Sequence, residues 1–183
     1  IMNISNFIET YKIPHDICEN FIKYHKKNKE YKKLGTMGRK GMVDKSVKDS
    51  IDVTFYNETT EKFILKFFNL LSKAVTSYIH KYKITSAVRT FIAHNIQHYE
   101  KNGGYFKQHY ERQNLYNLNR ELVYMLYCNN VKNGGTFFPF QQKRLECNKG
   151  DLIIWPAHFT HPHYGVISKE NEKYIVTGWL EII

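Results

Sequence analysis

The chain has 183 residues, of which 42% are hydrophobic and 15% aromatic, which predicts one globular domain and excludes a disordered chain. The formal net charge of +10 favours anionic partners, although the lysines are spread along the whole chain. The sequence has no run of about 18 apolar residues, so we expect no membrane span. Its first residues do not combine a basic and an apolar segment, so we expect no signal peptide. Because Cys18, Cys128 and Cys147 are far apart and odd in number, we expect no disulfide framework, no Cys-rich zinc site and a cytoplasmic setting.

Two helices are expected in the first part of the chain. Residues 14–28 start with a proline and carry apolar side chains on one helical face. Residues 60–82 show the clearest helical spacing of apolar residues, and Thr59 or Thr60 can cap this helix. Between the two, residues 36–50 contain glycines and few apolar side chains, so they predict a loop, which a probable strand follows.

From residue 85 onward, short β-prone runs alternate with turn signals. The predicted strands are 85–100, 105–111, 121–130, 136–140, 143–147, 151–156 and 173–183. Asn-Gly pairs at 102–103 and 133–134 lie between apolar runs and predict hairpin turns. We therefore expect a mainly β domain over residues 1–183, in which helices in about 1–82 pack outside a β-barrel or jelly roll in about 85–183.

The motif His109-Tyr110-Glu111 lies in one of the predicted strands. Because side chains alternate between the two faces of a strand, His109 and Glu111 should point the same way and offer two ligands to one metal. The segment 155–165 supplies three candidates for a third ligand, His158, His161 and His163. Two imidazoles and one carboxylate leave open positions, as a catalytic metal requires, and both zinc hydrolases and non-haem iron oxygenases use such a set.

The last predicted strand carries an unusual charge. Lys173, Thr177 and Trp179 share one face of this strand with apolar residues, and Tyr174 begins the opposite face. If the first face lines the barrel interior, Lys173 is a buried cation that would attract an anion. The alternative is that Lys173 simply faces water beside Glu172.

Taken together, the segments YEKNGGYFKQHYER, GGTFFPF and GDLIIWP…HPHYGV…KYIVTGW resemble the prolyl 4-hydroxylase-like 2-oxoglutarate- and iron(II)-dependent dioxygenases. The resemblance runs from about residue 85 to the end of the chain. It implies a double-stranded β-helix (jelly roll) and metal ligation by His109, Glu111 and His163, with His161 as the rival for the third position. The family usually has aspartate where this chain has Glu111, which keeps the charge and adds one methylene.

The same resemblance implies a cosubstrate site. Lys173 would pair with the C5 carboxylate of 2-oxoglutarate, and Tyr127 would help to hold that carboxylate. Tyr99 would lie near the metal end, and Thr177 would line the pocket. Since the chain has 14 tyrosines, simple packing is the alternative role for the two named here. The implied cofactors are Fe(II), 2-oxoglutarate as cosubstrate and O2, with ascorbate as a candidate reductant.

The activity that the resemblance implies is hydroxylation of prolyl residues in a peptide or protein, with release of succinate and CO2. The expected partner is therefore a proline-containing peptide or protein, with no membrane. One alternative is a hydroxylase of a free amino acid or other small molecule. Another is a metal- or nucleic-acid-binding module without catalysis, and the net positive charge is compatible with a nucleic-acid partner. The loop 36–50 is expected to be an ordinary solvated loop, and closure over a bound substrate is the alternative.

Overall fold

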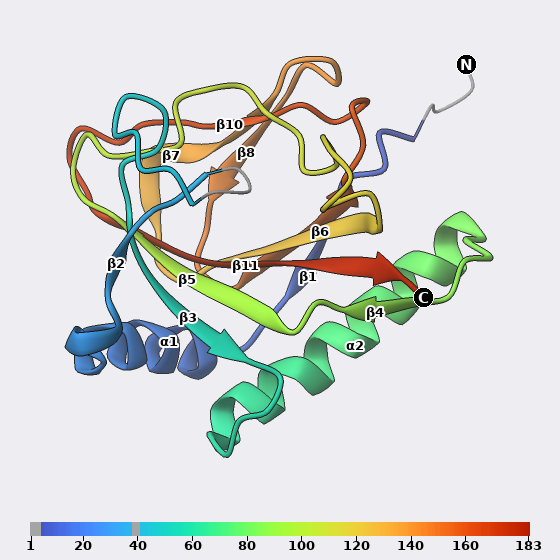
Figure 1. Ribbon diagram of the computed structural model, residues 1–183, viewed down its shortest axis with the longest axis horizontal. Coiled ribbons are helices and arrows are strands. Elements are labelled where there is room, and N and C mark those ends of the chain that lie inside the picture. The colour runs from blue at the N-terminus through green and yellow to red at the C-terminus, as the bar shows by residue number, and fades with distance from the viewer. Residues whose placement is uncertain (1–4, 38–40) are drawn as a thin grey trace.

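The computed structural model describes residues 5–37 and 41–183, which form two facing antiparallel sheets with two α-helices on the outer side of the larger sheet (Figure 1). The larger sheet has the order β1-β9-β6-β11-β5-β3-β2, with β4 paired to β11, and the smaller sheet has the order β10-β7-β8. This is the mainly β, double-stranded β-helix (jelly roll) arrangement flanked by helices that was expected.

The strands of the larger sheet are β1 (Glu9–Lys12), β2 (Lys33–Leu34), β3 (Ile51–Tyr56), β4 (Val88–Thr90), β5 (Ala93–Tyr99), β6 (Arg120–Tyr127), β9 (Asp151–Pro156) and β11 (Lys173–Ile182). The strands of the smaller sheet are β7 (Val131–Phe138), β8 (Lys143–Cys147) and β10 (Tyr164–Gly165). Strand β11 pairs with both β5 and β6 and so lies in the middle of the larger sheet. Side chains on its inner face therefore point into the space between the sheets.

Both predicted helices are confirmed, with small shifts at their ends. Helix α1 (His15–Lys27) follows Pro14, and a 3-10 turn η1 (Lys29–Tyr31) comes after it. Helix α2 (Lys62–Tyr82) begins later than predicted. The hydroxyl of Thr59 accepts a hydrogen bond from the Glu61 amide (3.2 Å), but this bond lies just before the helix, so neither Thr59 nor Thr60 is its cap.

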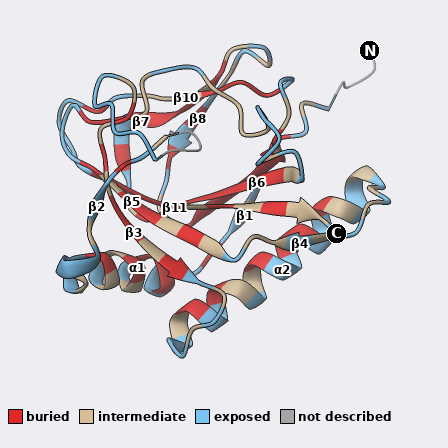
Figure 2. Ribbon diagram, in the orientation of Figure 1, coloured by how far each residue is buried: buried red, intermediate tan, exposed pale blue. Residues whose placement is uncertain are grey.

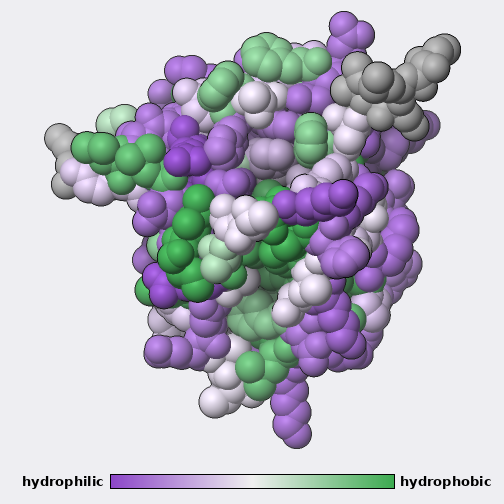
Figure 3. Space-filling model, turned by 90° about the vertical axis from the view of Figure 1, so that its right-hand side faces the viewer, coloured by the Kyte–Doolittle hydropathy of each residue, from purple (hydrophilic) through white to green (hydrophobic). Residues whose placement is uncertain are grey.

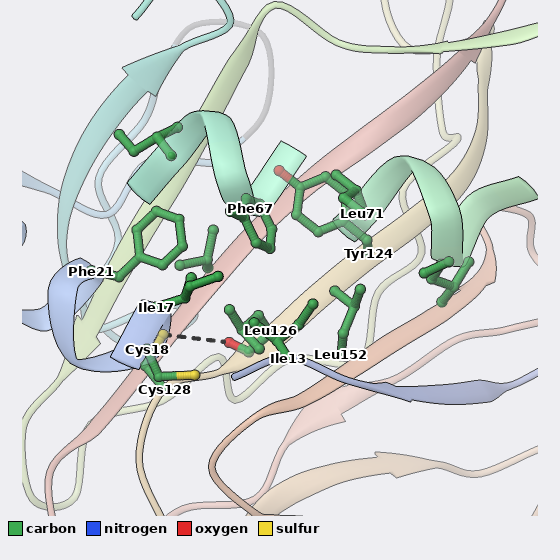
Figure 4. Close-up of a cluster of buried hydrophobic side chains, with 14 of the residues drawn as sticks. Ile13, Ile17, Cys18, Phe21, Phe67, Leu71, Tyr124, Leu126, Cys128 and Leu152 are labelled. Carbon is green, nitrogen blue, oxygen red and sulfur yellow. Dashed lines mark hydrogen bonds between the residues drawn. The ribbon is translucent and has the colours of Figure 1, made fainter. Parts of the chain in front are cut away.

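The core has two layers, because both faces of the larger sheet are covered. Figure 2 shows buried residues along the strands and on the sheet-facing sides of the helices. Figure 4 shows the outer layer, in which helical side chains meet those of β6 and β9; it includes Ile17, Phe21, Phe67, Leu71, Tyr124, Leu126 and Leu152. Full burial of one such apolar side chain contributes about 1.5–3 kcal/mol. The inner layer lies between the sheets and contains Tyr99, Tyr127 and Ile175.

Neither Asn-Gly pair forms the hairpin turn that was predicted. Asn102 has a positive φ of 66° in a turn, but the preceding strand β5 pairs with β3 and β11. The second pair lies inside β7, where the register against β8 shifts between Val131 and Thr136. A Cβ on Gly135 would lie 1.6 Å from the Leu145 carbonyl oxygen, so the glycine allows close approach of two strands instead of a reversal.

Two further expectations are corrected by the strand arrangement. Residues 105–111 form no regular strand, and their pairing is limited to isolated bridges from Tyr105 to Lys48 and from His109 to His163. The first part of the chain is also not purely helical, since β1 and β2 join the larger sheet in addition to the expected strand β3. Strand β1 is short and half exposed, and its pairing with β9 is what holds it extended.

Of the predicted loop 36–50, residues 38–40 lie outside the described residues. On either side of them, Met37 and Met42 exchange backbone hydrogen bonds (2.9 and 3.0 Å). At the base of the loop, Lys48 and Asp52 form a buried ion pair (2.7 Å). Closure of this loop over a substrate stays a prediction.

The surface is mainly hydrophilic on the face at the right of Figure 1. Figure 3 shows this face, where apolar side chains gather in and around a hollow and hydrophilic side chains surround them. Among the described residues, no helix is long and apolar enough to cross a membrane.

Candidate metal centre and cosubstrate pocket

His109, Glu111 and His163 each place one ligand atom within 4.8 Å of the other two. Oε1 of Glu111 lies 3.5 Å from Nε2 of His109 and 3.7 Å from Nε2 of His163. The two histidines are paired through their backbones, since each amide donates to the carbonyl of the other (3.0 and 2.9 Å). This single bridge, and not a regular strand, brings the two imidazoles side by side.

Glu111 joins the histidines because the chain turns after Tyr110. The amides of Glu111 and Arg112 both donate to the carbonyl of Ala157, at 3.2 and 3.0 Å. Ala157 directly follows β9, so the position of this turn is fixed by the larger sheet. The expectation that His109 and Glu111 point the same way is therefore confirmed, although strand alternation is not the cause.

Backbone carbonyls determine which ring nitrogen of His109 and of His163 is available to bind a metal. Nδ1 of His109 lies 2.9 Å from the Lys107 carbonyl, and Nδ1 of His163 lies 3.1 Å from the His161 carbonyl. A carbonyl can only accept, so each Nδ1 carries the proton and each Nε2 presents a lone pair. Three electron-rich atoms thus converge on one point, and only a cation between them satisfies all three. A divalent metal fits this arrangement.

The protonation states agree with a ligand role. Burial and the charge of the neighbouring His109 together lower the pKa of His163 to about 4, so His163 is neutral at pH 7. Burial alone would raise the pKa of Glu111, but the hydrogen bond and charge of His109 and the charge of His163, both acting while these imidazoles are protonated, and the charge of Arg120 lower it to about 2. Because His163 is neutral at pH 7, Arg120 is the neighbour that keeps its positive charge there.

The cluster opens into a cavity of about 370 Å³ between the two sheets. Lys173 lies in the wall of this cavity and is only 5% exposed, so the alternative in which it faces water is wrong. Its Nζ donates to the carbonyls of Gly134 (3.0 Å) and Val166 (3.3 Å), and it pairs with no carboxylate of the described residues. Burial lowers the pKa of Lys173 to about 8, which leaves the amine mostly charged at neutral pH.

The other predicted pocket residues line the same cavity. The Tyr127 hydroxyl and Thr136 Oγ1 are 2.7 Å apart, and the Tyr99 hydroxyl donates to Gln97 Oε1 (2.7 Å). Burial raises the pKa of both tyrosines well above its usual value, so both hydroxyls stay protonated. The hydroxyl of Thr177 donates to a backbone carbonyl (3.1 Å) and also faces the cavity. The inner face predicted for the last strand is thus confirmed.

The remaining candidate histidines lie elsewhere. Nε2 of His161 is 2.9 Å from the Asn6 carbonyl, and its Nδ1 is 2.9 Å from the Thr160 hydroxyl, so both ring nitrogens are engaged. His158 lies beside Glu121, 3.2 Å from a carboxylate oxygen. Between the two rivals for the third position, the structure therefore brings His163 to the cluster and turns His161 away.

Two neighbours of the cluster were not predicted from the sequence. Tyr105 stacks on the His109 ring, with centroids 3.6 Å apart and planes 13° apart. Arg120 lies 3.5 Å from a carboxylate oxygen of Glu111 and places its guanidinium 3.6 Å above the Trp179 ring. No sequence motif identifies Arg120, because its contacts to Glu111 and Trp179 join two different strands and a turn.

Comparisons with known proteins agree with this geometry. Residues 94–181 match the 2OG-Fe(II) oxygenase superfamily, and this stretch contains His109, Glu111, His163 and Lys173. The match supports the resemblance of this stretch to prolyl 4-hydroxylase-like 2-oxoglutarate and iron(II) oxygenases. A search of curated protein sequences found no match.

Solved structures with a similar fold include several prolyl hydroxylases. The viral collagen prolyl hydroxylase of Paramecium Bursaria Chlorella virus-1, in its 2OG complex, has 17% identity and a TM-score of 0.76, with 98% of each chain covered. A Pseudomonas putida prolyl-4-hydroxylase has 12% identity and a TM-score of 0.73, covering 96% of this chain and 92% of its own. A Trichoplax adhaerens prolyl hydroxylase, in complex with a hypoxia inducible factor peptide fragment, has 12% identity and a TM-score of 0.79, covering 97% and 84%. At these identities the similarity concerns the fold.

Proposed function

We propose that this chain is a 2-oxoglutarate- and Fe(II)-dependent dioxygenase that hydroxylates prolyl residues in a peptide or protein and releases succinate and CO2. One observation carries the proposal. Two imidazole lone pairs and a carboxylate converge in the same cavity that contains a buried lysine, which has no carboxylate partner in the part of the chain that the structure describes. A metal site next to a cation suits a cosubstrate that chelates the metal at one end and carries a carboxylate at the other.

In this proposal His109, Glu111 and His163 hold the iron. Bound iron(II) would supply the activation of dioxygen that hydroxylation needs. The residues of the chain then do the binding and orienting. Lys173 binds the C5 carboxylate of 2-oxoglutarate, and the protonated hydroxyl of Tyr127 donates to it. Because Lys173 is nearly fully buried, this ion pair forms away from water and fixes the direction in which the cosubstrate lies.

The peptide specificity draws on the fold relatives, whose names describe prolyl hydroxylases, one of them solved with a peptide fragment. A cytoplasmic location and a role for ascorbate as reductant are further proposals. Omission of ascorbate from a turnover assay would test the second directly.

Turnover is the test of the proposed function. The protein would be incubated with Fe(II), ascorbate, 2-oxoglutarate and proline-containing peptides, and succinate would be measured together with the peptide mass. We expect one succinate for each oxygen atom gained, no gain when alanine replaces proline, and no turnover in His163→Ala. His161→Ala is the matched control and should retain turnover.

The other outcomes decide against parts of the proposal. Oxidation of free proline or another small molecule, with peptides left unchanged, would replace the peptide substrate. Absence of succinate under all conditions, together with salt-dependent binding of RNA or DNA, would favour the non-catalytic nucleic-acid module.

A further inference from the structure

The two oxygens of Glu111 have different surroundings. Oε1 faces Nε2 of both histidines, at 3.5 and 3.7 Å. Oε2 instead accepts a hydrogen bond from the indole Nε1 of Trp179, at 2.8 Å, and lies 3.5 Å from Arg120. Arg120 also reaches the backbone carbonyl of Glu111, at 3.4 Å. One oxygen is therefore directed at the metal position and the other is already occupied.

The groups that occupy Oε2 are themselves held in place. Arg120 begins β6, Trp179 lies on the adjacent strand β11, and the guanidinium covers the indole ring at 3.6 Å from its centroid. Phe91 packs edge-on against the same ring, with centroids 6.1 Å apart. Such a stacked cation and aromatic ring keeps the indole N–H aimed in one direction.

Glutamate needs this restraint more than aspartate would. Its extra methylene adds one rotatable bond, so a free glutamate can swing away or offer both oxygens to a metal. The methylene also sets the reach of the side chain, because an aspartate on the same backbone would draw the carboxylate back by about 1.5 Å. The 2.8 Å contact to Trp179 would then exceed hydrogen-bonding distance.

We infer that Trp179 and Arg120 are positioning residues, which hold the unusual Glu111 so that it binds the metal through one oxygen. The side chain of Glu111 has the length that is needed to reach the indole N–H of Trp179. This inference rests on the proposed metal site. It predicts that, in this chain, substitution by the aspartate that the family usually has weakens metal binding. Residues next to a ligand commonly change metal affinity by about 10- to 100-fold when they are removed.

Co(II) serves as the probe, because its binding and its visible d–d spectrum can be measured without dioxygen or turnover. Trp179→Phe should weaken Co(II) binding by about tenfold or more and change the spectrum. Glu111→Asp should do the same. The double variant Glu111→Asp/Trp179→Phe should be no weaker than the worse single variant, since both substitutions break the same hydrogen bond.

Two controls separate the hydrogen bond from the ring. Replacement of Trp179 by benzothienylalanine keeps the shape of the ring and removes the N–H, and it should reproduce the effect of Trp179→Phe. Trp155→Phe removes the other indole, which packs on His163 with ring centroids 5.0 Å apart but whose Nε1 has no partner among the described residues. It should weaken Co(II) binding less than Trp179→Phe does, and thermal unfolding reports whether each variant is folded.

Failure of the inference and failure of the metal site look different. If the wild type binds no Co(II), or if His163→Ala binds it as the wild type does, the proposed metal site is wrong and the inference falls with it. If the wild type binds Co(II) through His163, and both variants with a replaced Trp179 bind Co(II) as tightly as the wild type does, only the inference is overturned. The inference is also overturned if the losses of Co(II) binding free energy in the two single variants add up in the double variant.

Discussion

Replacing Lys173 by methionine, which has a similar shape and no charge, should affect cosubstrate binding and folding in opposite directions. The buried amine would pair with the C5 carboxylate of 2-oxoglutarate, and removal of one partner of a buried, hydrogen-bonded charge pair costs about 2–5 kcal/mol. We therefore expect Lys173→Met to weaken 2-oxoglutarate binding by about 100-fold. Lys173→Arg keeps the charge and should lose much less affinity.

Folding should show the cost of burying the same charge. The fall of the pKa of Lys173 from 10.5 to about 8 corresponds to about 3 kcal/mol of destabilisation in the absence of ligand. The folded state releases this proton more readily than the unfolded state. The penalty is therefore fully present below pH 8 and disappears as the pH rises to about 10.5.

Two measurements test this reasoning about Lys173. Calorimetric titration without dioxygen gives the affinity for 2-oxoglutarate, and chemical denaturation at pH 7 and pH 9.5 gives the free energy of unfolding. Between these two pH values, the wild type should gain about 2 kcal/mol relative to Lys173→Met, because other titrations are common to both proteins. Equal 2-oxoglutarate affinities, or a stability difference that does not change with pH, would refute the account of Lys173.

Three further outcomes follow from the same structure. Tyr127→Phe should weaken 2-oxoglutarate binding by about tenfold and cost about 1 kcal/mol of stability, since it also leaves the Thr136 hydroxyl without its partner; titration and urea unfolding measure the two effects. Gly135→Ala should destabilise the protein by more than about 3 kcal/mol, because its Cβ would overlap the Leu145 carbonyl, and a wild-type melting temperature would contradict this contact. Removal of metal with a chelator should lower the melting temperature of the wild type but not that of His163→Ala.

The spacing of apolar residues in the sequence was enough to predict those helices and strands in which the buried face follows from the local pattern. The apolar spacing of residues 60–82 identified the second helix, and alternation along 173–183 identified which side chains face the cavity. Burial of Lys173 followed from the same alternation once that face was placed inside. The sequence also predicted that His109 meets a distant histidine, because a site with two imidazoles and one carboxylate requires a second histidine.

Features that depend on partners far away in the chain could not be found in this way. Residues 133–135 read as a turn, yet they continue a strand because the opposite strand requires glycine there. The segment 105–111 reads as a strand, yet its geometry comes from one bridge and from the carbonyl of Ala157. Arg120 is placed on Trp179 by a pairing between strands that no local pattern describes.

The central claim is that His109, Glu111 and His163 hold a metal that 2-oxoglutarate chelates beside Lys173. The most direct test is the visible spectrum of the protein without dioxygen, first with Fe(II) and then with 2-oxoglutarate. We predict a charge-transfer band that appears only when both are present, persists in His161→Ala and is absent in His163→Ala. A wild-type protein without this band, or a His163→Ala variant that retains it, would contradict the claim.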